Sequence, residues 1–382
     1  MPDFSYLIVG GGMTAAAAAK GIREVDAKGT VGILSAEPHR PYQRPPLSKA
    51  LWQGKPEDGI WIELPKGVEV QQGRRAVAID RKAHRVRDDR GDEHGYGKLL
   101  LATGGAPKKL PFGSGVVYFR TLDDYRKLRA LEGARVAVIG GGFIGSEIAA
   151  SLAQNGRKVT IIFPEEGICA RAFPIELSKF VTDYYRGKGV EVLAGEGVSG
   201  IDGGAVLSKG GRSIEADVIV AGLGIAPSTE LAAQAALAVS DGIDVDEALR
   251  TSDPDIFAAG DVARFHNPAL GKRLRVEHED NANTMGAAAG RSMAGAPVSY
   301  QHLPFFYSDL FDLGYEAVGE IDARHQTVAD WKTPFREGVV YYRAEGRVRG
   351  VLLWNTWGQV DNARALIAEK APPAELKGRL PR

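Results

Sequence analysis

A glycine-rich turn between a strand and a helix occurs twice in this chain of 382 residues, and each time a second strand follows the helix. The first copy, residues 10–15 (GGGMTA), follows a strand predicted over 6–9. The second copy, residues 140–145 (GGGFIG), follows a strand predicted over 135–139. This order is typical of a βαβ unit that binds the pyrophosphate of a dinucleotide at the helix N-terminus. Two copies in the same context therefore predict two dinucleotide sites.

The positions of such a turn have separate tasks. Gly10 allows the tight turn, Gly12 lets the backbone approach a pyrophosphate, and Ala15 lets the helix pack close to the sheet. The turn positions at which we expect contact with the two dinucleotides are Gly10, Gly12, Thr14, Ala15, Gly140, Gly142, Phe143 and Ile144.

An acidic residue follows the second strand of each unit. Glu37 comes after a strand predicted over 30–34, and Glu165 and Glu166 come after a strand predicted over 158–163. A carboxylate at this place accepts hydrogen bonds from ribose hydroxyls. Because no arginine stands beside Glu165 and Glu166 in the sequence, we expect the second site to prefer NADH over NADPH.

Two more predicted strands end in small or polar residues. Residues 99–101 run into Thr103 and Gly104, and residues 256–259 run into Gly260 and Asp261. A carboxylate such as Asp261, held at a strand end beside a bound nucleotide, can accept a hydrogen bond from a sugar or ribityl hydroxyl. Each segment alone is more often an ordinary strand and turn, so that interpretation stays open beside the binding one.

The pattern changes after about residue 300. Residues 339–342 and 348–354 alternate like an antiparallel pair of strands, and a last helix is expected over 360–370. Earlier in the chain, the basic segment 74–90 indicates the solvated faces of a hairpin, with a docking patch for an acidic electron carrier as the alternative.

Composition excludes several classes of function. The formal net charge is zero, which gives no reason to expect nucleic acid or an anionic membrane as partner. Cys169 is the single cysteine, so electrons cannot pass through a dithiol within the chain. The apolar run 4–19 lacks a basic start and contains three glycines, which disfavours a signal peptide. We expect a cytoplasmic protein with no membrane span and no metal site.

Several strings together resemble a known family. They are PYQRPPLSKALW, GGGFIGSE, FPEEG, VEHEDNA and SDLFDLGYEAVGEID. With the two glycine turns, they resemble the FAD/NAD-dependent reductases of the glutathione reductase structural class. Within that class the chain is most similar to the apoptosis-inducing factor family and to the ferredoxin reductases that serve oxygenases. The resemblance covers nearly the whole chain.

The resemblance implies an α/β fold with two Rossmann-type FAD/NAD(P)-binding domains and a smaller α+β C-terminal domain. It places the FAD domain at 1–115 and 224–300, the NADH domain at 116–223 and the C-terminal domain at 301–382. The expected cofactors are FAD and NAD, with NADH preferred. Tyr307 stands where relatives usually have tryptophan, and the stretch 322–337 is short where animal apoptosis-inducing factors carry a long insertion.

Roles for particular residues also follow from the resemblance. Those implied to border FAD are Glu37 on the adenosine ribose, Arg44 and Lys49 along the flavin, Thr103, Gly104, Arg120 near the phosphates, Gly224, Gly260, Asp261 on the ribityl chain, and Glu277, His278 and Tyr307 around the isoalloxazine. Those implied to meet NADH are Phe143 and Glu147 at the nicotinamide and Glu165 near the adenine ribose.

Four residues are expected to act in catalysis: Lys49, Glu147, Phe143 and His278. A cation near the flavin stabilises negative charge on it, and a buried ammonium needs a partner, so Lys49 and Glu147 are expected to pair. Phe143 is expected to gate the nicotinamide position, with a core phenylalanine as the alternative. His278 precedes a helix expected over 284–293, and capping of that helix by Asn281 or Asn283 explains part of the polar run.

Two functions remain open from the sequence. In the first, an enzyme transfers hydride from NADH to the flavin N5 and passes electrons to an external acceptor: a ferredoxin, as in an oxygenase system, a quinone or oxygen. A long-lived charge-transfer complex of reduced flavin and NAD fits this reaction. In the second, an NADH sensor changes its homodimerisation or its partner binding when the flavin is reduced. A nucleotide-binding protein without redox function is a third, weaker alternative.

Overall fold

The computed structural model of the chain describes residues 3–131, 133–369 and 375–381. The chain forms two compact units, each built from three segments. Unit 1 contains Met1–Arg44, Glu57–Ala106 and Ala226–Pro304, and unit 2 contains Pro45–Pro56, Pro107–Ile225 and Phe305–Arg382. The short segment Pro45–Pro56 therefore packs in unit 2, although its neighbours in the sequence on both sides belong to unit 1.

Unit 1 is built on a sheet whose parallel strands lie in the order β3-β2-β1-β6, with β19 also paired to β6. The strands are β1 (Phe4–Val9), β2 (Val31–Ser35), β3 (Val68–Gln72), β6 (Glu93–Leu101) and β19 (Ile256–Ala258). β1 and β2 read as nearly continuous apolar runs and are buried almost throughout, as expected of parallel strands covered on both faces. The sequence therefore predicted this βαβ core within a residue or two at each boundary.

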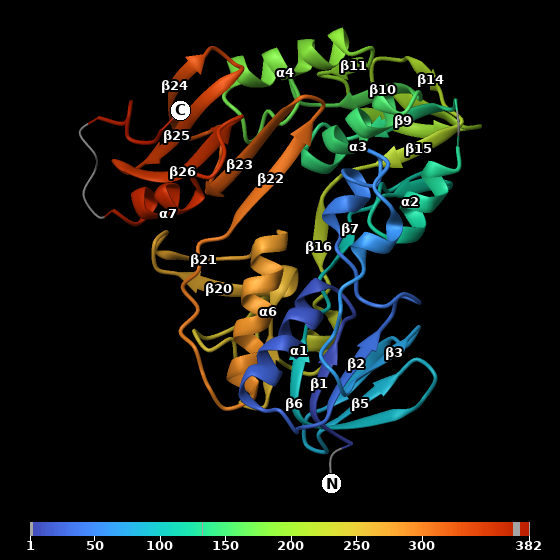
Figure 1. The fold of residues 1–382 in the computed structure, drawn as a ribbon. Coiled ribbons are helices and arrows are strands. Elements are labelled where there is room, and N and C mark those ends of the chain that lie inside the picture. The colour runs from blue at the N-terminus through green and yellow to red at the C-terminus, as the bar shows by residue number, and fades with distance from the viewer. Residues whose placement is uncertain (1–2, 132, 370–374, 382) are drawn as a thin grey trace. The chain divides into compact units, whose positions relative to one another are not determined.

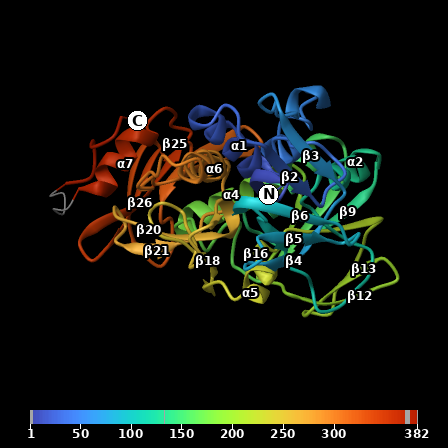
Figure 2. The same ribbon diagram turned by 90° about the horizontal axis from the view of Figure 1, so that it is seen from below.

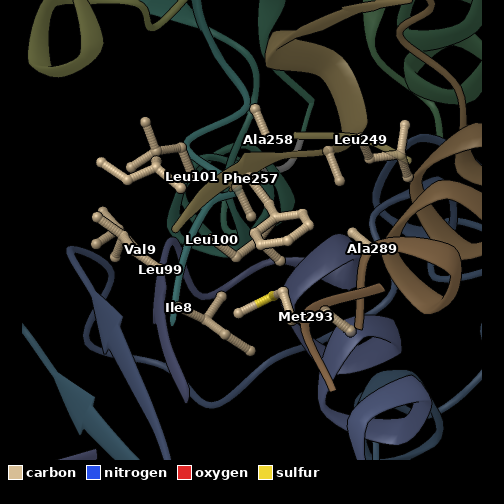
Figure 3. Packing of buried hydrophobic residues seen from close by; sticks show 14 of the residues in the cluster. Ile8, Val9, Leu99, Leu100, Leu101, Leu249, Phe257, Ala258, Ala289 and Met293 are labelled. Atoms are coloured by element: carbon tan, nitrogen blue, oxygen red, sulfur yellow. The ribbon is translucent and has the colours of Figure 1, made fainter. Parts of the chain in front are cut away.

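Two helices of unit 1 lie side by side, α1 (Met13–Val25) and α6 (Glu279–Met293), and both ribbon views show them in contact (Figures 1 and 2). Their backbones approach closely because glycine faces the neighbouring helix. A Cβ at Gly286 or Gly290 would lie only 2.5 Å or 2.1 Å from the carbonyl oxygens of Thr14 and Ala18. Figure 3 shows Met293 and Phe257 packed with Ile8 and the β6 leucines in the core of this unit.

The rest of unit 1 is a set of short elements. The predicted hairpin is confirmed: β4 (Ala76–Asp80) and β5 (Arg85–Asp88) pair antiparallel, and β5 continues into β6. A small sheet has the order β17-β18-β20-β21. Its strands and the remaining elements are β17 (Val239–Ser240), β18 (Gly242–Asp244), β20 (Ala263–Asn267), β21 (Lys272–Leu274), α5 (Glu230–Gln234), η2 (Glu57–Ile60) and η3 (Gly260–Val262).

Unit 2 contains a second parallel sheet, with the order β11-β10-β9-β15-β8. Its strands are β8 (Val116–Tyr118), β9 (Arg135–Ile139), β10 (Lys158–Phe163), β11 (Glu191–Ala194) and β15 (Val218–Ala221). The accompanying elements are η1 (Pro45–Ser48), α2 (Leu122–Arg129), α3 (Phe143–Gln154), α4 (Ile175–Gly187), and the antiparallel strands β12 (Val198–Asp202), β13 (Ala205–Ser208) and β14 (Ser213–Glu215). β7 (Gly105–Pro107) and β16 (Ile225–Pro227), in which the chain passes from one unit to the other, pair as a two-stranded sheet.

The two parallel sheets repeat one pattern down to single hydrogen bonds. In unit 1 the last residue of β2 pairs with Gln72 of β3, and Gly73 N then donates to Glu37 O at 3.1 Å. In unit 2 the last residue of β10 pairs with Ala194 of β11, and Gly195 N donates to Glu165 O at 2.7 Å. Glu37 and Glu165 are therefore equivalent positions of an internal repeat.

The C-terminal part of unit 2 is an antiparallel sheet with the order β22-β23-β26-β25-β24. Its elements are β22 (Phe305–Leu310), β23 (Leu313–Gly319), β24 (Gln326–Thr333), β25 (Glu337–Ala344), β26 (Arg347–Trp354) and α7 (Val360–Ala368). The predicted antiparallel pair is confirmed as β25 and β26, in which Tyr341 faces Val351. The last helix is confirmed to Ala368, and the expected end at Lys370 lies outside the described residues.

The expected start of α6 was wrong. The helix begins at Glu279 with His278 as its N-cap residue, so Asn281 lies in the first turn and cannot cap it. The Asn281 amide donates to Val276 O at 3.0 Å and accepts from Tyr300 Oη at 3.0 Å. Small residues in a helix that packs as closely as α6 are a packing requirement, and the polar residues before them continue the same helix.

Cys169 of unit 2 is buried, and burial raises the pKa of its thiol to about 12. Because the thiolate is the reactive form, we expect the folded protein to resist alkylating and disulfide-exchange reagents at neutral pH. Reaction with a chromogenic disulfide reagent in increasing urea tests this. One thiol per chain should react only as unit 2 unfolds, and rapid reaction of the native protein would contradict the burial of Cys169.

Within the described residues, none of the helices combines the length and hydropathy that a membrane span requires.

Candidate active site

The first glycine turn of unit 1 has the shape that a dinucleotide needs. Gly10 has a φ of +118°, and a Cβ there would lie 2.1 Å from Ala102 O, so only glycine fits. Gly12 is the N-cap residue of α1, and a Cβ there would meet no atom within 4 Å. The open space lies in front of the first N–H groups of a helix, where the dipole favours an anion. Ala15 is fully buried, as its packing role requires.

The second turn, in unit 2, repeats this geometry. Gly140 has a φ of +113°, and its Cβ would lie 2.5 Å from Gly222 O. Gly142 is the N-cap residue of α3, and again a Cβ would meet nothing within 4 Å. Gly145 replaces the alanine of the first turn because a Cβ there would lie 1.9 Å from Gly140 O. Both turns therefore leave room for a pyrophosphate at the start of a helix, which is what FAD and NAD(H) require.

The carboxylate after β2 is held by two neighbours in unit 1. Tyr42 Oη donates to Glu37 Oε2 at 2.6 Å, and Arg44 forms an ion pair with Oε1. Burial lowers the pKa of Arg44, whereas the Glu37 carboxylate and, to a smaller extent, Asp261 raise it. The pKa of Arg44 is raised on balance. The three predicted FAD contacts Glu37, Arg44 and Asp261 thus lie in one electrostatic environment. A cavity of about 410 Å³ borders β1 and β2 near them, lined in part by Val9, Ala36 and Thr103.

The carboxylate after β10 in unit 2 also has an arginine partner. Arg171 Nη2 lies 2.5 Å from Glu165 Oε1, and the arginine side chain is largely exposed. A cavity of about 530 Å³ begins at Pro164, next to Glu165, and Lys209 and Arg212 contribute to its lining. Glu165 therefore has an arginine beside it in space, although Arg171 stands six positions further along the sequence.

The expected pair of Lys49 and Glu147 is present within unit 2. Lys49 Nζ lies 2.7 Å from Glu147 Oε2, and both side chains are at most 10% exposed. Lys49 follows the short helix η1, and Glu147 lies in the second turn of α3. A buried ion pair of this kind costs desolvation energy, which makes it weak evidence for stability and stronger evidence for a functional requirement.

Aromatic rings lie around this pair. Lys49 Nζ is 5.2 Å from the centre of the Tyr307 ring, within the range of a cation–π contact. Phe143, at the start of α3, is half-buried, with its ring centre 5.0 Å from that of Phe306 and 6.2 Å from that of Tyr315. Ile144 beside it is 41% exposed. Phe143 thus packs on aromatic residues of the C-terminal sheet without being fully buried, which is compatible with the gate and with the core interpretation.

The other expected site residues are distributed over both units. In unit 1, Thr103 Oγ1 donates to Ser228 O at 2.8 Å, and Ser228 N donates to Gly104 O. Gly260 abuts α1, since a Cβ there would lie 2.3 Å from Thr14 Oγ1. Further along unit 1, Glu277 pairs with Arg275 at 2.7 Å directly before the N-cap residue His278. In unit 2, Arg120 N donates to Asp124 at 3.0 Å, and Gly224 O accepts from Lys108 N at 2.9 Å.

Several basic residues of the hairpin in unit 1 pair with neighbouring carboxylates. Arg74 pairs with Asp88 and Asp92, and Arg81 pairs with Asp253 at 2.7 Å. The solvated-hairpin interpretation of residues 74–90 accounts for these contacts. In the part of the chain that the structure describes, no cluster of three or more His, Cys, Asp or Glu side chains is placed to hold a metal ion.

Three residues with roles in these sites were missed from the sequence. Ser48 and Ser308 donate to the Glu147 carboxylate, and Arg171 pairs with Glu165. The serines lie 99 and 161 positions from Glu147, and no periodicity connects such distant residues. Arg171 could have been found by comparing the repeats, because Glu37 and Glu165 are each followed within seven residues by an arginine.

Comparisons with known proteins agree with this geometry. Residues 4–286 match the family model described as pyridine nucleotide-disulphide oxidoreductase. Residues 289–334 match the model described as apoptosis-inducing factor, mitochondrion-associated, C-term.

Relatives that match over most of their length include a ferredoxin reductase and an apoptosis-inducing factor. The chain is 37% identical to the ferredoxin–NAD(+) reductase component of the anthranilate 1,2-dioxygenase system of Burkholderia cepacia, over 96% of this chain and 95% of that one. It is 34% identical to apoptosis-inducing factor 1 of Dictyostelium discoideum, over 98% of this chain and 80% of that one. Putidaredoxin reductase in its covalent complex with putidaredoxin has a TM-score of 0.90 at 29% identity, over 97% of this chain and 94% of that one.

The family match, the two glycine turns and the expected α/β architecture lead to one assignment. The chain belongs to the pyridine nucleotide-disulphide oxidoreductase family and is an FAD- and NAD(H)-dependent oxidoreductase.

Proposed function

We propose that this oxidoreductase takes a hydride from NADH onto FAD and delivers the electrons to a separate iron–sulfur protein of the ferredoxin class. The observation that carries the proposal is the lone cysteine. Family members named for a disulphide pass electrons to one, but Cys169 is the single cysteine of the chain and is buried. The electrons must therefore leave the protein. Several full-length relatives are named ferredoxin or putidaredoxin reductases, which supports a ferredoxin as the acceptor.

The residues of the chain bind and orient the two dinucleotides, and they exclude water from the place where the dinucleotides react. The open turns at Gly12 and Gly142 place the first N–H groups of α1 and α3 toward the two pyrophosphates. Glu37 and Glu165, each fixed by an arginine, accept hydrogen bonds from ribose hydroxyls. FAD, when bound, supplies the chemistry that accepts a hydride and releases electrons singly.

Lys49 and Glu147 are proposed to act at the reacting end. A cation held in one place beside the flavin stabilises the negative charge that reduction adds, and its buried position strengthens that effect. Glu147 holds Lys49 and keeps it from turning toward water. Phe143, half-buried at the start of the same helix, is proposed to cover the nicotinamide position until NADH binds. The roles of His278, Glu277 and Tyr307 at the isoalloxazine remain proposals of the same kind.

An anaerobic titration with NADH, followed by ferredoxin or air, tests the proposal. We expect a flavin absorbance spectrum that bleaches with one NADH per chain and recovers when an oxidised ferredoxin is added. A purified protein without a flavin spectrum, or one that NADH does not bleach, would exclude the proposed reaction.

A second function is favoured by a separate observation. Residues 289–334 match the C-terminal model of apoptosis-inducing factor, which supports an NADH sensor. In that case a broad long-wavelength charge-transfer band should persist for minutes after air is admitted, and the oligomeric state should change with NADH. Rapid reoxidation, with an unchanged molecular mass in light scattering, would exclude the NADH sensor and favour the electron-transfer enzyme.

The preference for NADH is proposed to depend on Glu165. Replacing Glu165 by alanine removes the ribose acceptor and leaves Arg171 without its carboxylate partner. We expect kcat/KM for NADH to fall about tenfold, as the loss of a hydrogen bond to a charged group implies. The value for NADPH should stay level or rise, because the released Arg171 can meet a 2′-phosphate.

Steady-state kinetics with both nucleotides measures this change. Glu166→Gln, one residue away and exposed, is the matched control and should change neither value. An equal loss for NADH and NADPH in Glu165→Ala would show that Glu165 does not discriminate between them.

A further inference from the structure

The Glu147 carboxylate accepts from three donors elsewhere in unit 2. Oε2 accepts from Lys49 Nζ at 2.7 Å and from Ser48 Oγ at 2.7 Å. Oε1 accepts from Ser308 Oγ at 2.6 Å. Glu147 itself is only 4% exposed, and Ser308 only 1%. Two hydroxyls therefore share the carboxylate with the ammonium, and both oxygens have a neutral donor of their own.

The carboxylate and its donors come from three separate segments of the chain. Ser48 ends η1, Glu147 lies in α3, and Ser308 lies in β22. One turn further along α3, Ser151 Oγ donates to Ser48 O at 2.6 Å, which fixes the backbone that presents Ser48 and Lys49. Helix α3 thus bonds to the Ser48–Lys49 segment through Glu147 and through Ser151. Strand β22 supplies a further contact, to the other oxygen of the Glu147 carboxylate.

We propose that Ser308 and Ser48 are positioning residues: they orient the Glu147 carboxylate, and through it they hold the Lys49 ammonium in one place. The proposal rests on the proposed function, in which Lys49 acts beside the flavin. A lysine side chain has large rotational freedom, so a partner with a fixed orientation is needed to hold it.

A second carboxylate lies in the same part of unit 2. Asp309 follows Ser308 in β22 and is half-buried. Burial raises its pKa, the Lys49 cation lowers it, and the Glu147 charge raises it further. Lys49 therefore has a second acidic group within electrostatic reach, and the hydroxyl of Ser308 favours the arrangement in which Glu147 holds it. Titratable groups within electrostatic reach of Glu147 also include Cys169, Tyr185 and Tyr315, whose pKa values burial raises.

The test compares the FAD-loaded variants Ser308→Ala and Ser48→Ala with the wild type. Ser178→Ala is the control, since it removes an equally buried hydroxyl of unit 2 that donates to Ile168 O. The first readout is the acetylation of Lys49 by trace acetic anhydride, measured by mass spectrometry. We expect it to rise about five- to tenfold in both variants, as the loss of one hydrogen bond to a carboxylate implies, and to stay level in the control.

The second readout is the rate of flavin reduction by NADH in a stopped-flow instrument. We expect the limiting rate to fall in Ser308→Ala with an unchanged Kd for NADH, because the Lys49 ammonium is less firmly held. Ser308→Thr keeps the hydroxyl and should restore the rate.

Different results would contradict the positioning proposal and the proposed function. Equal acetylation of Lys49 in Ser308→Ala, Ser48→Ala and the control would overturn the positioning proposal. Faster acetylation with an unchanged rate of reduction would support the positioning of Lys49 and would remove Lys49 from the proposed reaction. A wild type that NADH does not reduce would end the proposed function, and the acetylation result would still decide the positioning.

Discussion

Replacing Gly142 by alanine is expected to leave unit 2 folded and to abolish productive NADH binding. The φ of Gly142 is −81°, which alanine adopts without strain, and the added Cβ would meet no protein atom within 4 Å. The space that the methyl group enters is the space proposed for the pyrophosphate. Loss of one or two hydrogen bonds to a charged phosphate corresponds to about 2 kcal/mol or more, so NADH affinity should fall at least about 30-fold.

Gly12→Ala is the matched variant of unit 1. It should lose FAD on purification while its NADH affinity, measured by calorimetry, stays near that of the FAD-free wild type. Gly140→Ala is the opposite control. Its φ of +113° and a Cβ 2.5 Å from Gly222 O predict a loss of folding stability of at least about 1–3 kcal/mol. Normal NADH affinity in a well-folded Gly142→Ala protein would mean that the dinucleotide does not cross this turn.

Glu147→Leu is expected to destabilise the protein and to stop rapid reduction by NADH. The substitution leaves the largely buried Lys49 ammonium, and the hydroxyls of Ser48 and Ser308, without their acceptor. Removing one partner of a buried ion pair costs about 3–5 kcal/mol. Urea denaturation followed by circular dichroism measures the loss, and stopped-flow absorbance measures the rate.

The double variant Lys49→Met with Glu147→Leu separates the two effects. Replacing a buried pair by apolar side chains of similar size is often neutral or stabilising, so most of the lost stability should return. The rate of flavin reduction should not return, because the cation is gone. A double variant that is both stable and fast would show that the pair serves neither purpose.

Much of the fold could be predicted from local pattern. β9 and β10 have the predicted boundaries, since a strand buried on both faces reads as a short apolar run that a glycine turn ends. Lys49 and Glu147 were expected to pair because a resemblance singled out both, and the structure places Nζ and Oε2 at 2.7 Å. The beginning of α6 was misplaced because Asn281, a typical capping residue, is here bonded to Tyr300 within the first turn.

The rest depended on contacts between distant segments. Nothing in the neighbourhood of Ser308 indicates that its hydroxyl meets a carboxylate 161 positions earlier. Pro45–Pro56 lies between two segments of unit 1 in the sequence. It packs in unit 2 because Glu147 and Ser151 of α3 form hydrogen bonds with Ser48. The pairing of Arg171 with Glu165 lies between these cases, because only a comparison of the two repeats points to it.

The close packing of α1 against α6 has a consequence for folding during translation. α1 ends at Val25, and α6 begins only at Glu279. At about 5–20 residues per second, the first helix waits on the ribosome for roughly 10–50 s before its partner exists. During that time the apolar surface of α1 that packs against α6 stays uncovered. The segment 107–225 of unit 2 is synthesised in the same interval. Nascent chains should therefore depend on holding chaperones until α6 leaves the exit tunnel, and truncation before Glu279 should yield an insoluble product.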